Sequence, residues 1–269
     1  MTDIQKAAAA IADSETLMIT AGAGMGVDSG LPDFRGPEGF WRAYPALRGH
    51  SFEEMANPAW FHKNPRRAWG FYGHRLNLYR QIKPHQGFDI LLKWSQTRDY
   101  FIYTANVDGA FQRAGFSSKK IVECHGSIHH LQYVDTHHGR GVWSAKDTRI
   151  EVDETTVLAS HPLPQQNGYL LRPNILMFGD WGWVGERCNE QESRLRSWLR
   201  KVNLETTIVI EMGAGKVVPT TRHFGESLQS AGATLLRINP RDSDGPEGTI
   251  SIAGGAMDSL RSIDSILGT

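Results

Sequence analysis

Short apolar runs alternate along the chain with longer segments of helical composition or spacing. The short runs are too brief for helices and predict buried strands at residues 16–20, 100–103, 121–122, 207–212 and 234–238. Helices are expected at residues 4–12, 66–82, 87–94 and 220–231. In the second of these, apolar residues recur three or four positions apart after Pro65, which suits a first helical turn. The alternation is typical of a parallel sheet in a doubly wound, Rossmann-like α/β fold.

One region interrupts this alternation. Between residues 129 and 171, His, Gly, Asp and Thr are frequent and periodicity is weak, which favours a loop-rich or short-stranded insertion. We therefore expect a single domain over residues 1–269 with a small inserted lobe. The predicted larger lobe comprises residues 1–50, 84–126 and 172–269, and the smaller lobe comprises residues 51–83 and 127–171.

Charge balance and cysteine count narrow the class of protein. The 269 residues include 29 basic and 29 acidic side chains, whereas proteins that bind nucleic acid or membrane surfaces usually have a basic excess, so neither partner is expected. No targeting segment or membrane span is visible in the sequence. The two cysteines, Cys124 and Cys188, are too few for a disulfide framework or a four-thiolate zinc site. A reducing cytoplasm is the expected location.

A glycine-rich loop follows the first predicted strand. Residues 22–30 read GAGMGVDSG, and glycines at this place let backbone N–H groups approach a phosphate. No Gly-Lys-Ser/Thr follows, so the loop is not a P-loop. Many turns are also rich in glycine, but a position directly after a buried strand favours nucleotide binding.

Several motifs together resemble the sirtuin (Sir2) family. Residues 22–36 read GAGMGVDSGLPDFRG, which is similar to a GAGxS loop that runs into SGxPDFRG. Further similar segments follow in the family's order over residues 15–260. They are Pro84-His85, TANVD at 104–108 (family TQNID), HG at 125–126, RPNILMFGD at 172–180 (family RPxxxxFGE), GAG at 213–215 with Pro219 (family GTSxxVxP) and IN at 238–239.

This resemblance implies an NAD-dependent protein-lysine deacylase. Such enzymes transfer the acyl group from lysine to the ADP-ribose part of NAD and release nicotinamide. His125 is the implied general base, because a histidine side chain titrates near neutral pH. Asn106 is implied to contact the ribose and an attacking water, and Asp108 the nicotinamide carboxamide. The simpler interpretations are a structural histidine, and an Asn and an Asp that favour a turn or helix cap.

The resemblance also implies the cofactor and substrate contacts. Phe34 would shield the ribose, Arg35 would lie near phosphate or nicotinamide, and Asn239 would contact the adenosine ribose. The full implied NAD set is Gly22, Ala23, Gly24, Gly26, Asp33, Phe34, Arg35, Ala105, Asn106, Asp108, Gly213, Ala214, Gly215 and Asn239. The implied substrate contacts, for an acylated lysine protein or peptide or another small acceptor, are Tyr72, Arg75, Phe178, Gly179 and Trp181.

Tyr72 and Arg75 lie three residues apart on one predicted helix. They resemble the YxxR pair of sirtuins that prefer succinyl- or malonyl-lysine, in which an arginine and a phenol hold a carboxylate. A surface arginine beside a core tyrosine is the alternative.

Four departures from the family pattern leave other activities open. The stretch after His125-Gly126 lacks the usual four zinc-binding cysteines, and we predict no metal, because the adjacent histidines of this stretch are poorly placed to share one ion. Gly26, Ala105 and the GAG at 213–215 each replace a side chain that could bond NAD. An ADP-ribosyltransferase, an NAD glycohydrolase, or a non-catalytic NAD or ADP-ribose sensor therefore remains an alternative.

Overall fold

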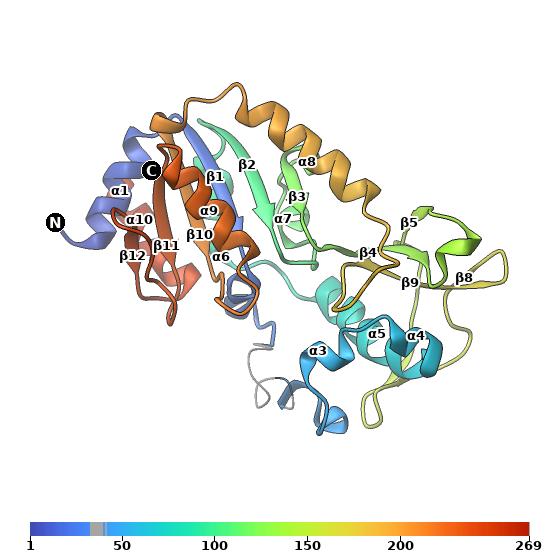
Figure 1. Cartoon of the computed structure of the whole chain (residues 1–269). Coiled ribbons are helices and arrows are strands. Elements are labelled where there is room, and N and C mark those ends of the chain that lie inside the picture. Colours follow the sequence, from blue (N-terminus) through green and yellow to red (C-terminus); the bar gives the residue numbers. More distant parts are fainter. Residues whose placement is uncertain (33–39, 41, 269) are drawn as a thin grey trace.

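A six-stranded parallel sheet forms the larger lobe. The computed structural model describes residues 1–32, 40 and 42–268. The strands follow the order β12-β11-β10-β1-β2-β3 (Figure 1). They are β1 (Thr16–Ala21), β2 (Asp99–Thr104), β3 (Ile121–Glu123), β10 (Thr207–Met212), β11 (Thr234–Ile238) and β12 (Ile250–Ile252). All adjacent strands in this sheet pair in parallel, as the alternating pattern predicts.

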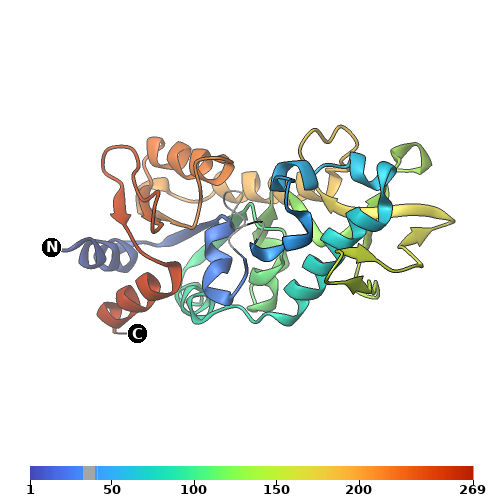
Figure 2. The same ribbon diagram turned by 90° about the horizontal axis from the view of Figure 1, so that it is seen from below.

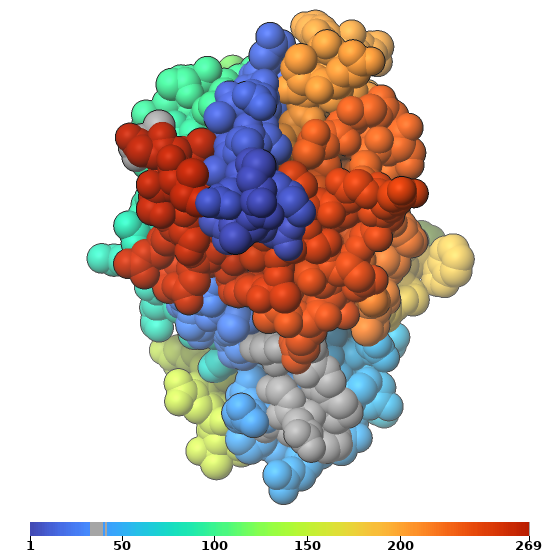
Figure 3. All heavy atoms as spheres, turned by 90° about the vertical axis from the view of Figure 1, so that its left-hand side faces the viewer, coloured from blue at the N-terminus to red at the C-terminus, as the bar shows by residue number. Residues whose placement is uncertain are grey.

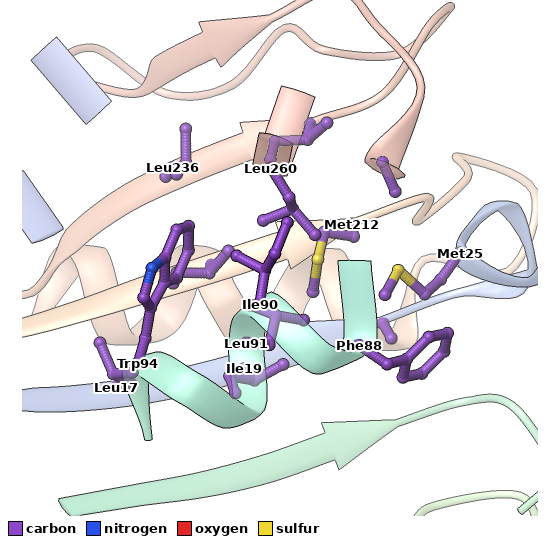
Figure 4. Close-up of a cluster of buried hydrophobic side chains, with 14 of the residues drawn as sticks. Leu17, Ile19, Met25, Phe88, Ile90, Leu91, Trp94, Met212, Leu236 and Leu260 are labelled. Atoms are coloured by element: carbon purple, nitrogen blue, oxygen red, sulfur yellow. The ribbon is translucent and has the colours of Figure 1, made fainter. Parts of the chain in front are cut away.

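Helices cover both faces of this sheet. On one face, Leu17 and Ile19 of β1 share a core with α1 (Asp3–Asp13), α6 (Gln86–Trp94) and α10 (Ala256–Leu267), and Figure 4 shows the α6 side chains against the sheet. On the other face, Met18 packs with α8 (Glu186–Leu199) and α9 (Thr220–Ser230). Successive residues of a strand point to opposite faces, so a continuously apolar strand requires this double cover. The doubly wound, Rossmann-like fold is thus confirmed.

The two ends of the chain meet on the larger lobe. Figure 3 shows the N-terminal helix α1 on the surface, with segments from the C-terminal part of the chain on either side of it. The packing of α1 against α10 explains this arrangement, since Ala7 and Ile11 share a core with Leu260 and Ile263.

Within the described part of the larger lobe, three α-helices and one strand were not predicted from the sequence, namely the short α7 (Ala110–Arg113), α8, α10 and β12. The α8 sequence is strongly polar, and its buried positions are few, so its apolar stripe is narrow. Strand β12 has only three residues and lies at the sheet edge. The buried face of α10 repeats at helical spacing and could have been recognised.

The smaller lobe combines short strands and helices. Its main sheet has the order β5-β4-β9-β8, and Figure 2 shows this lobe at the end of the molecule away from the termini. The elements are α3 (Phe52–Met55), α4 (Ala59–Lys63), α5 (Pro65–Gln81), β4 (Gly126–Tyr133), β5 (Val142–Ser144), β6 (Val152–Asp153), β7 (Leu158–Ala159), β8 (Gln165–Gln166) and β9 (Tyr169–Ile175). Its core also includes Phe40, Tyr44 and Leu47, which the predicted boundary at residue 50 assigns to the larger lobe, and β9 crosses the predicted boundary at 172.

Helix α5 holds the irregular segment of the smaller lobe in place through hydrogen bonds and close backbone contact. Arg66 Nε donates to the carbonyl of Ala159 at 2.8 Å, and Asn77 Nδ2 donates to that of Ile150 at 2.8 Å. A Cβ added to Gly70 would lie 2.0 Å from the Val157 carbonyl oxygen, so the helix and the β6–β7 hairpin are in backbone contact. One helix therefore satisfies carbonyls of a loop-rich segment that has little regular structure of its own.

A buried ion pair stabilises the smaller lobe at the end of β9. Arg172 on β9 donates to both carboxylate oxygens of Asp180, at 2.7 and 2.8 Å, and both side chains are almost fully buried. Asp180 also accepts the backbone N–H groups of Met177 and Gly182. A bidentate pair with further donors compensates for the loss of hydration of the two charges, and it fixes the turn after β9.

The first prediction concerns this ion pair. Replacement Arg172→Met leaves the Asp180 carboxylate buried without its cation, and we expect the free energy of unfolding to fall by about 3–5 kcal/mol. Urea denaturation measures the change. The matched control is Arg140→Met, which removes an exposed pair with Glu186 and is expected to cost less than about 1 kcal/mol. Similar losses in the two variants would contradict the structural importance of the buried pair.

Candidate functional site

The register of the parallel sheet brings the predicted site residues to one edge. Ala21 of β1 pairs with Thr104 of β2 and with Met212 of β10, and Thr104 pairs with Glu123 of β3. Met212 in turn pairs with Ile238 of β11. All five are the last residues of their strands, so the loops that follow begin side by side. Ligands of doubly wound sheets bind at such carboxyl ends.

Two glycine-rich loops meet at the centre of this edge. Gly22 donates to the carbonyl of Met212 and Gly24 to that of Gly213, at 2.9 and 3.0 Å. A Cβ added to Gly24 would lie 2.7 Å from Gly213 Cα, and Gly213 itself has a φ of +62°. Side chains are therefore excluded where the backbones touch. Gly26 is buried against Leu31, so the absence of the family's serine leaves a closely packed loop.

His125 lies at the end of β3 with its ring partly enclosed. Its Nε2 is 3.4 Å from Thr220 Oγ1 at the start of α9. Burial lowers the pKa of His125 below its ordinary value of 6.5, and a hydrogen bond with the backbone of Ala105 opposes this effect. The imidazole is therefore neutral near pH 7 and able to accept a proton. Ala105 contributes to the site through its backbone, although its side chain is small.

Asn106 and Asp108 follow β2 in the neighbouring loop. Asn106 Nδ2 donates to the Gly22 carbonyl at 2.9 Å, which joins this loop to the first glycine-rich loop. Asp108 is buried, and its Oδ1 accepts the Ala110 N–H at 2.8 Å. Burial raises the pKa of the Asp108 carboxyl, while the Ala110 hydrogen bond and the charge of Arg113 lower it. The turn-forming and functional interpretations of these residues are thus compatible.

The remaining predicted cofactor residues have different surroundings. Asn239 is buried, donates to the Ala214 carbonyl at 2.8 Å and accepts two backbone N–H groups of its own loop. It therefore positions the loops after β10 and β11. Ala23 is exposed and Gly215 is partly exposed at the same edge. The predictions for Asp33, Phe34 and Arg35 lie outside the described residues.

This edge fits a dinucleotide. Glycine loops without Cβ atoms allow close backbone approach to phosphates. The polar side chains of Asn106, Asp108 and His125 suit a ribose and an amide.

The predicted acyl-binding pair lies within α5. Arg75 is only 6% exposed, and its guanidinium lies 5.3–5.7 Å from the ring centres of four aromatic residues, which are Phe52, Phe71, Tyr72 and Tyr79. Its Nε and Nη2 donate to the Tyr79 hydroxyl at 3.0 and 2.8 Å. Tyr72 is buried, which raises its pKa. The alternative interpretation of a surface arginine is therefore wrong, since Arg75 is enclosed by aromatic rings.

The predicted substrate segment after β9 is apolar and exposed. Trp181 is fully exposed and Phe178 is 39% exposed, while Gly179 between them has a φ of +66°. Phe178 donates its backbone N–H to the Ala56 carbonyl and packs edge-on against Phe52. Exposed aromatic side chains of this kind are commonly contact points for a partner.

Sequence reasoning missed three residues that support the site. Thr220 contacts His125, and its place after Pro219 at the start of a predicted helix was the available signal. Arg113 Nη1 and His129 Nε2 both donate to the Asp108 carbonyl, at 2.5 and 2.8 Å. No sequence signal linked these two residues to Asp108.

Among residues 1–32, 40 and 42–268, no group of three or more His, Cys, Asp or Glu side chains is placed to hold a metal ion. Cys124 and Cys188 are free and buried. In the part of the chain that the structure describes, no helix has the length and apolar character needed to span a membrane.

Comparisons with known proteins agree with this geometry. An NAD-dependent protein deacylase of Leptospira interrogans is 30% identical over 228 residues, which cover 83% of this chain and 80% of the relative. One from Aquifex aeolicus is 29% identical and covers 84% of each. The crystal structure of a Sir2 homologue in complex with NAD matches with a TM-score of 0.70 at 25% identity, over 98% of this chain and 94% of that one.

The family model for Sir2 matches residues 22–218. This span contains both glycine-rich loops, the Asn106–Asp108 loop and His125. The chain is a member of the Sir2 family.

Proposed function

We propose that this protein is an NAD-dependent protein-lysine deacylase. The observation that carries the proposal is the position of His125, which is neutral through burial and is held between Ala105 and Thr220. It lies at the strand edge where Asn106 and two glycine-rich loops meet. The relatives named NAD-dependent protein deacylases support this activity.

Different residues of the site would have different roles in this reaction. The backbones of residues 22–24 and 213–215 would hold the phosphates of NAD, which would supply the ribose whose hydroxyl takes the acyl group after nicotinamide has left C1′. Asn106 would orient the ribose, and the buried Asp108 would bind the nicotinamide amide. His125 would take up a hydroxyl proton at a ring nitrogen, because its lowered pKa keeps that nitrogen unprotonated.

The acylated lysine would approach along the segment after β9. Phe178 and Trp181 expose apolar surface there, and Gly179 gives the turn its left-handed backbone. The turn is anchored by the buried Arg172–Asp180 pair. A rigid, apolar edge is suited to an extended peptide whose lysine side chain enters the site.

Arg75 and Tyr72 would recognise a carboxylate at the end of the acyl group. A guanidinium packed by four aromatic rings is fixed in orientation and weakly hydrated, so it would bind a buried carboxylate strongly. The competing role is structural, since Arg75 also donates to Tyr79.

The expected cytoplasmic location agrees with two free, buried cysteines.

The central prediction concerns the products. With NAD and a panel of acetyl-, malonyl- and succinyl-lysine peptides, mass spectrometry is expected to detect O-acyl-ADP-ribose and nicotinamide. His125→Ala is expected to lower kcat/KM by about 10²–10⁴-fold, the usual contribution of a general base. The control His223→Ala removes an exposed histidine of α9 and should leave the rate unchanged. ADP-ribose formed without peptide would indicate NAD hydrolysis, and ADP-ribose attached to protein would indicate transfer; either as the sole activity would contradict the proposal.

A second prediction concerns pH. The base must be unprotonated, so activity is lost as the pH falls through the pKa of His125. Because burial places this pKa below 6.5, the midpoint of the acidic decline in kcat/KM is expected to lie below pH 6.5. Melting temperatures at each pH serve as the control for unfolding. An acidic limb centred above pH 6.5 would refute the assigned pKa shift.

A third prediction concerns acyl preference. Arg75→Met keeps most of the side-chain volume but removes the charge. We expect kcat/KM for succinyl-lysine peptide to fall by about 10- to 100-fold, with little change for acetyl-lysine peptide. Arg66→Met on the same helix is the control, since Arg66 bonds the Ala159 carbonyl instead. An equal loss on both peptides would show that Arg75 serves only packing.

A further inference from the structure

A cavity lies between the two lobes, beside the Asp108 segment. Its volume is about 670 Å³, and α8, the start of β4, the segment 109–119 and the end of β5 surround it. Figure 1 shows α8 running above β3 toward β4 at this place. The predicted cofactor residues that the structure describes do not line it. We call this cavity the basic pocket, after its lining cations Arg80, Arg113, Lys119, Lys146, Arg187 and Arg194.

The basic pocket has a strong excess of positive charge. Among its described lining residues, Glu190 is the one carboxylate beside six arginines and lysines. Glu123, which is outside this lining set, pairs with Arg187 and offsets one further charge. The chain as a whole has 29 basic and 29 acidic residues. The excess is therefore local to this cavity, where a low-dielectric wall strengthens its field.

Helix α8 contributes one face to the basic pocket. Arg187, Glu190, Gln191 and Arg194 line it, and they are separated by three, one and three positions. Such spacing places them on one side of a helix. Arg196 is exposed on the same helix, and it pairs with Glu192 outside this lining set. Only some of the basic side chains of α8 therefore line the pocket.

Two polar atoms in the pocket wall are unsatisfied. Arg187 Nη1 and His130 Nδ1 are buried and have no hydrogen-bond partner among the described residues. Burial and the charge of Arg187 lower the pKa of His130 to about 4. Buried polar atoms usually have partners, so these two atoms leave hydrogen-bonding capacity in the pocket wall unused.

Other cations of the pocket are held in place by carbonyl groups. Arg113 donates to the Asp108 carbonyl at 2.5 Å, and Arg80 donates to those of Thr148 and Ala145 at 2.7 and 2.5 Å. A carbonyl orients a guanidinium without cancelling its charge. These cations are thus ordered before any ligand arrives, which lowers the entropic cost of binding.

We propose that the basic pocket binds a multiply phosphorylated small molecule. Guanidinium groups match phosphate oxygens in pairs, lysines add point charges, and the hydroxyls of Ser118, Ser127 and Ser144 add short donors. The volume lies in the range of small-molecule sites. The six cations gather around one cavity of limited volume, which favours a compact polyanion over a nucleic-acid strand, because a strand would require an extended basic surface.

The test uses inorganic tripolyphosphate as the probe. Isothermal titration calorimetry at constant ionic strength is expected to show one saturable site on the full chain, in the presence of excess ADP-ribose to occupy the proposed nucleotide cleft. The double variant Lys119→Gln/Arg194→Gln is expected to weaken binding by about 10-fold or more. The matched control is Arg196→Gln/Lys201→Gln, which removes two exposed charges outside the pocket and should change affinity less than about twofold.

Several results would overturn the proposal. They are the absence of saturable binding at roughly 1 mM probe, equal weakening in both double variants, and loss of the site when ADP-ribose is added. Tighter binding of single-stranded DNA that the pocket variant abolishes would assign the pocket to nucleic acid instead. Binding is read without turnover, so these outcomes are independent of whether the proposed deacylase activity is correct.

Discussion

The parallel register of the larger sheet is the constraint on which the site depends. Ala21, Thr104, Glu123, Met212 and Ile238 end their strands at the same level, so five loops leave the sheet together. Helices on both faces are required because the strands are apolar on both sides. The alignment of the strand ends is therefore sufficient to bring the glycine loops, Asn106 and His125 together. The backbone of Ala105 and the hydroxyl of Thr220 complete the surroundings of the imidazole.

The smaller lobe shows how the fold keeps its shape without a four-cysteine module. Its core is rich in large aromatic side chains, and α5 donates hydrogen bonds to carbonyls of the segment 145–159. The Arg172–Asp180 pair fixes the turn after β9 from within. Aromatic packing and charge-assisted hydrogen bonds can replace a metal when enough surface is buried. The exposed Phe178 and Trp181 are therefore presented by a turn that is anchored on both sides.

Charges are distributed unevenly over a chain with no net charge. At the strand edge, burial depresses the pKa of His125 and raises that of the Asp108 carboxyl, so both side chains shift toward their neutral forms. The backbone carbonyl of Asp108 accepts hydrogen bonds from Arg113 and His129, and both of these residues line the basic pocket. The strand edge and the cationic pocket thus share one short segment of backbone, although the overall charge predicts neither.

The sequence by itself determined five of the six strands of the larger sheet, the four helices α1, α5, α6 and α9, the glycine loops and the family, because these depend on runs and motifs of a few neighbouring residues. The strands 207–212 and 234–238 were predicted to the residue. Helix α8 was missed because its buried stripe is narrow, and the enclosure of Arg75 was missed because aromatic residues from two helices form it. Only the tertiary structure decided the alignment of the strand ends, the Arg172–Asp180 pair and the basic pocket. The strand ends and the pocket bring together residues that are far apart along the chain, and Arg172 and Asp180, although they share one motif, pair only through the turn after β9.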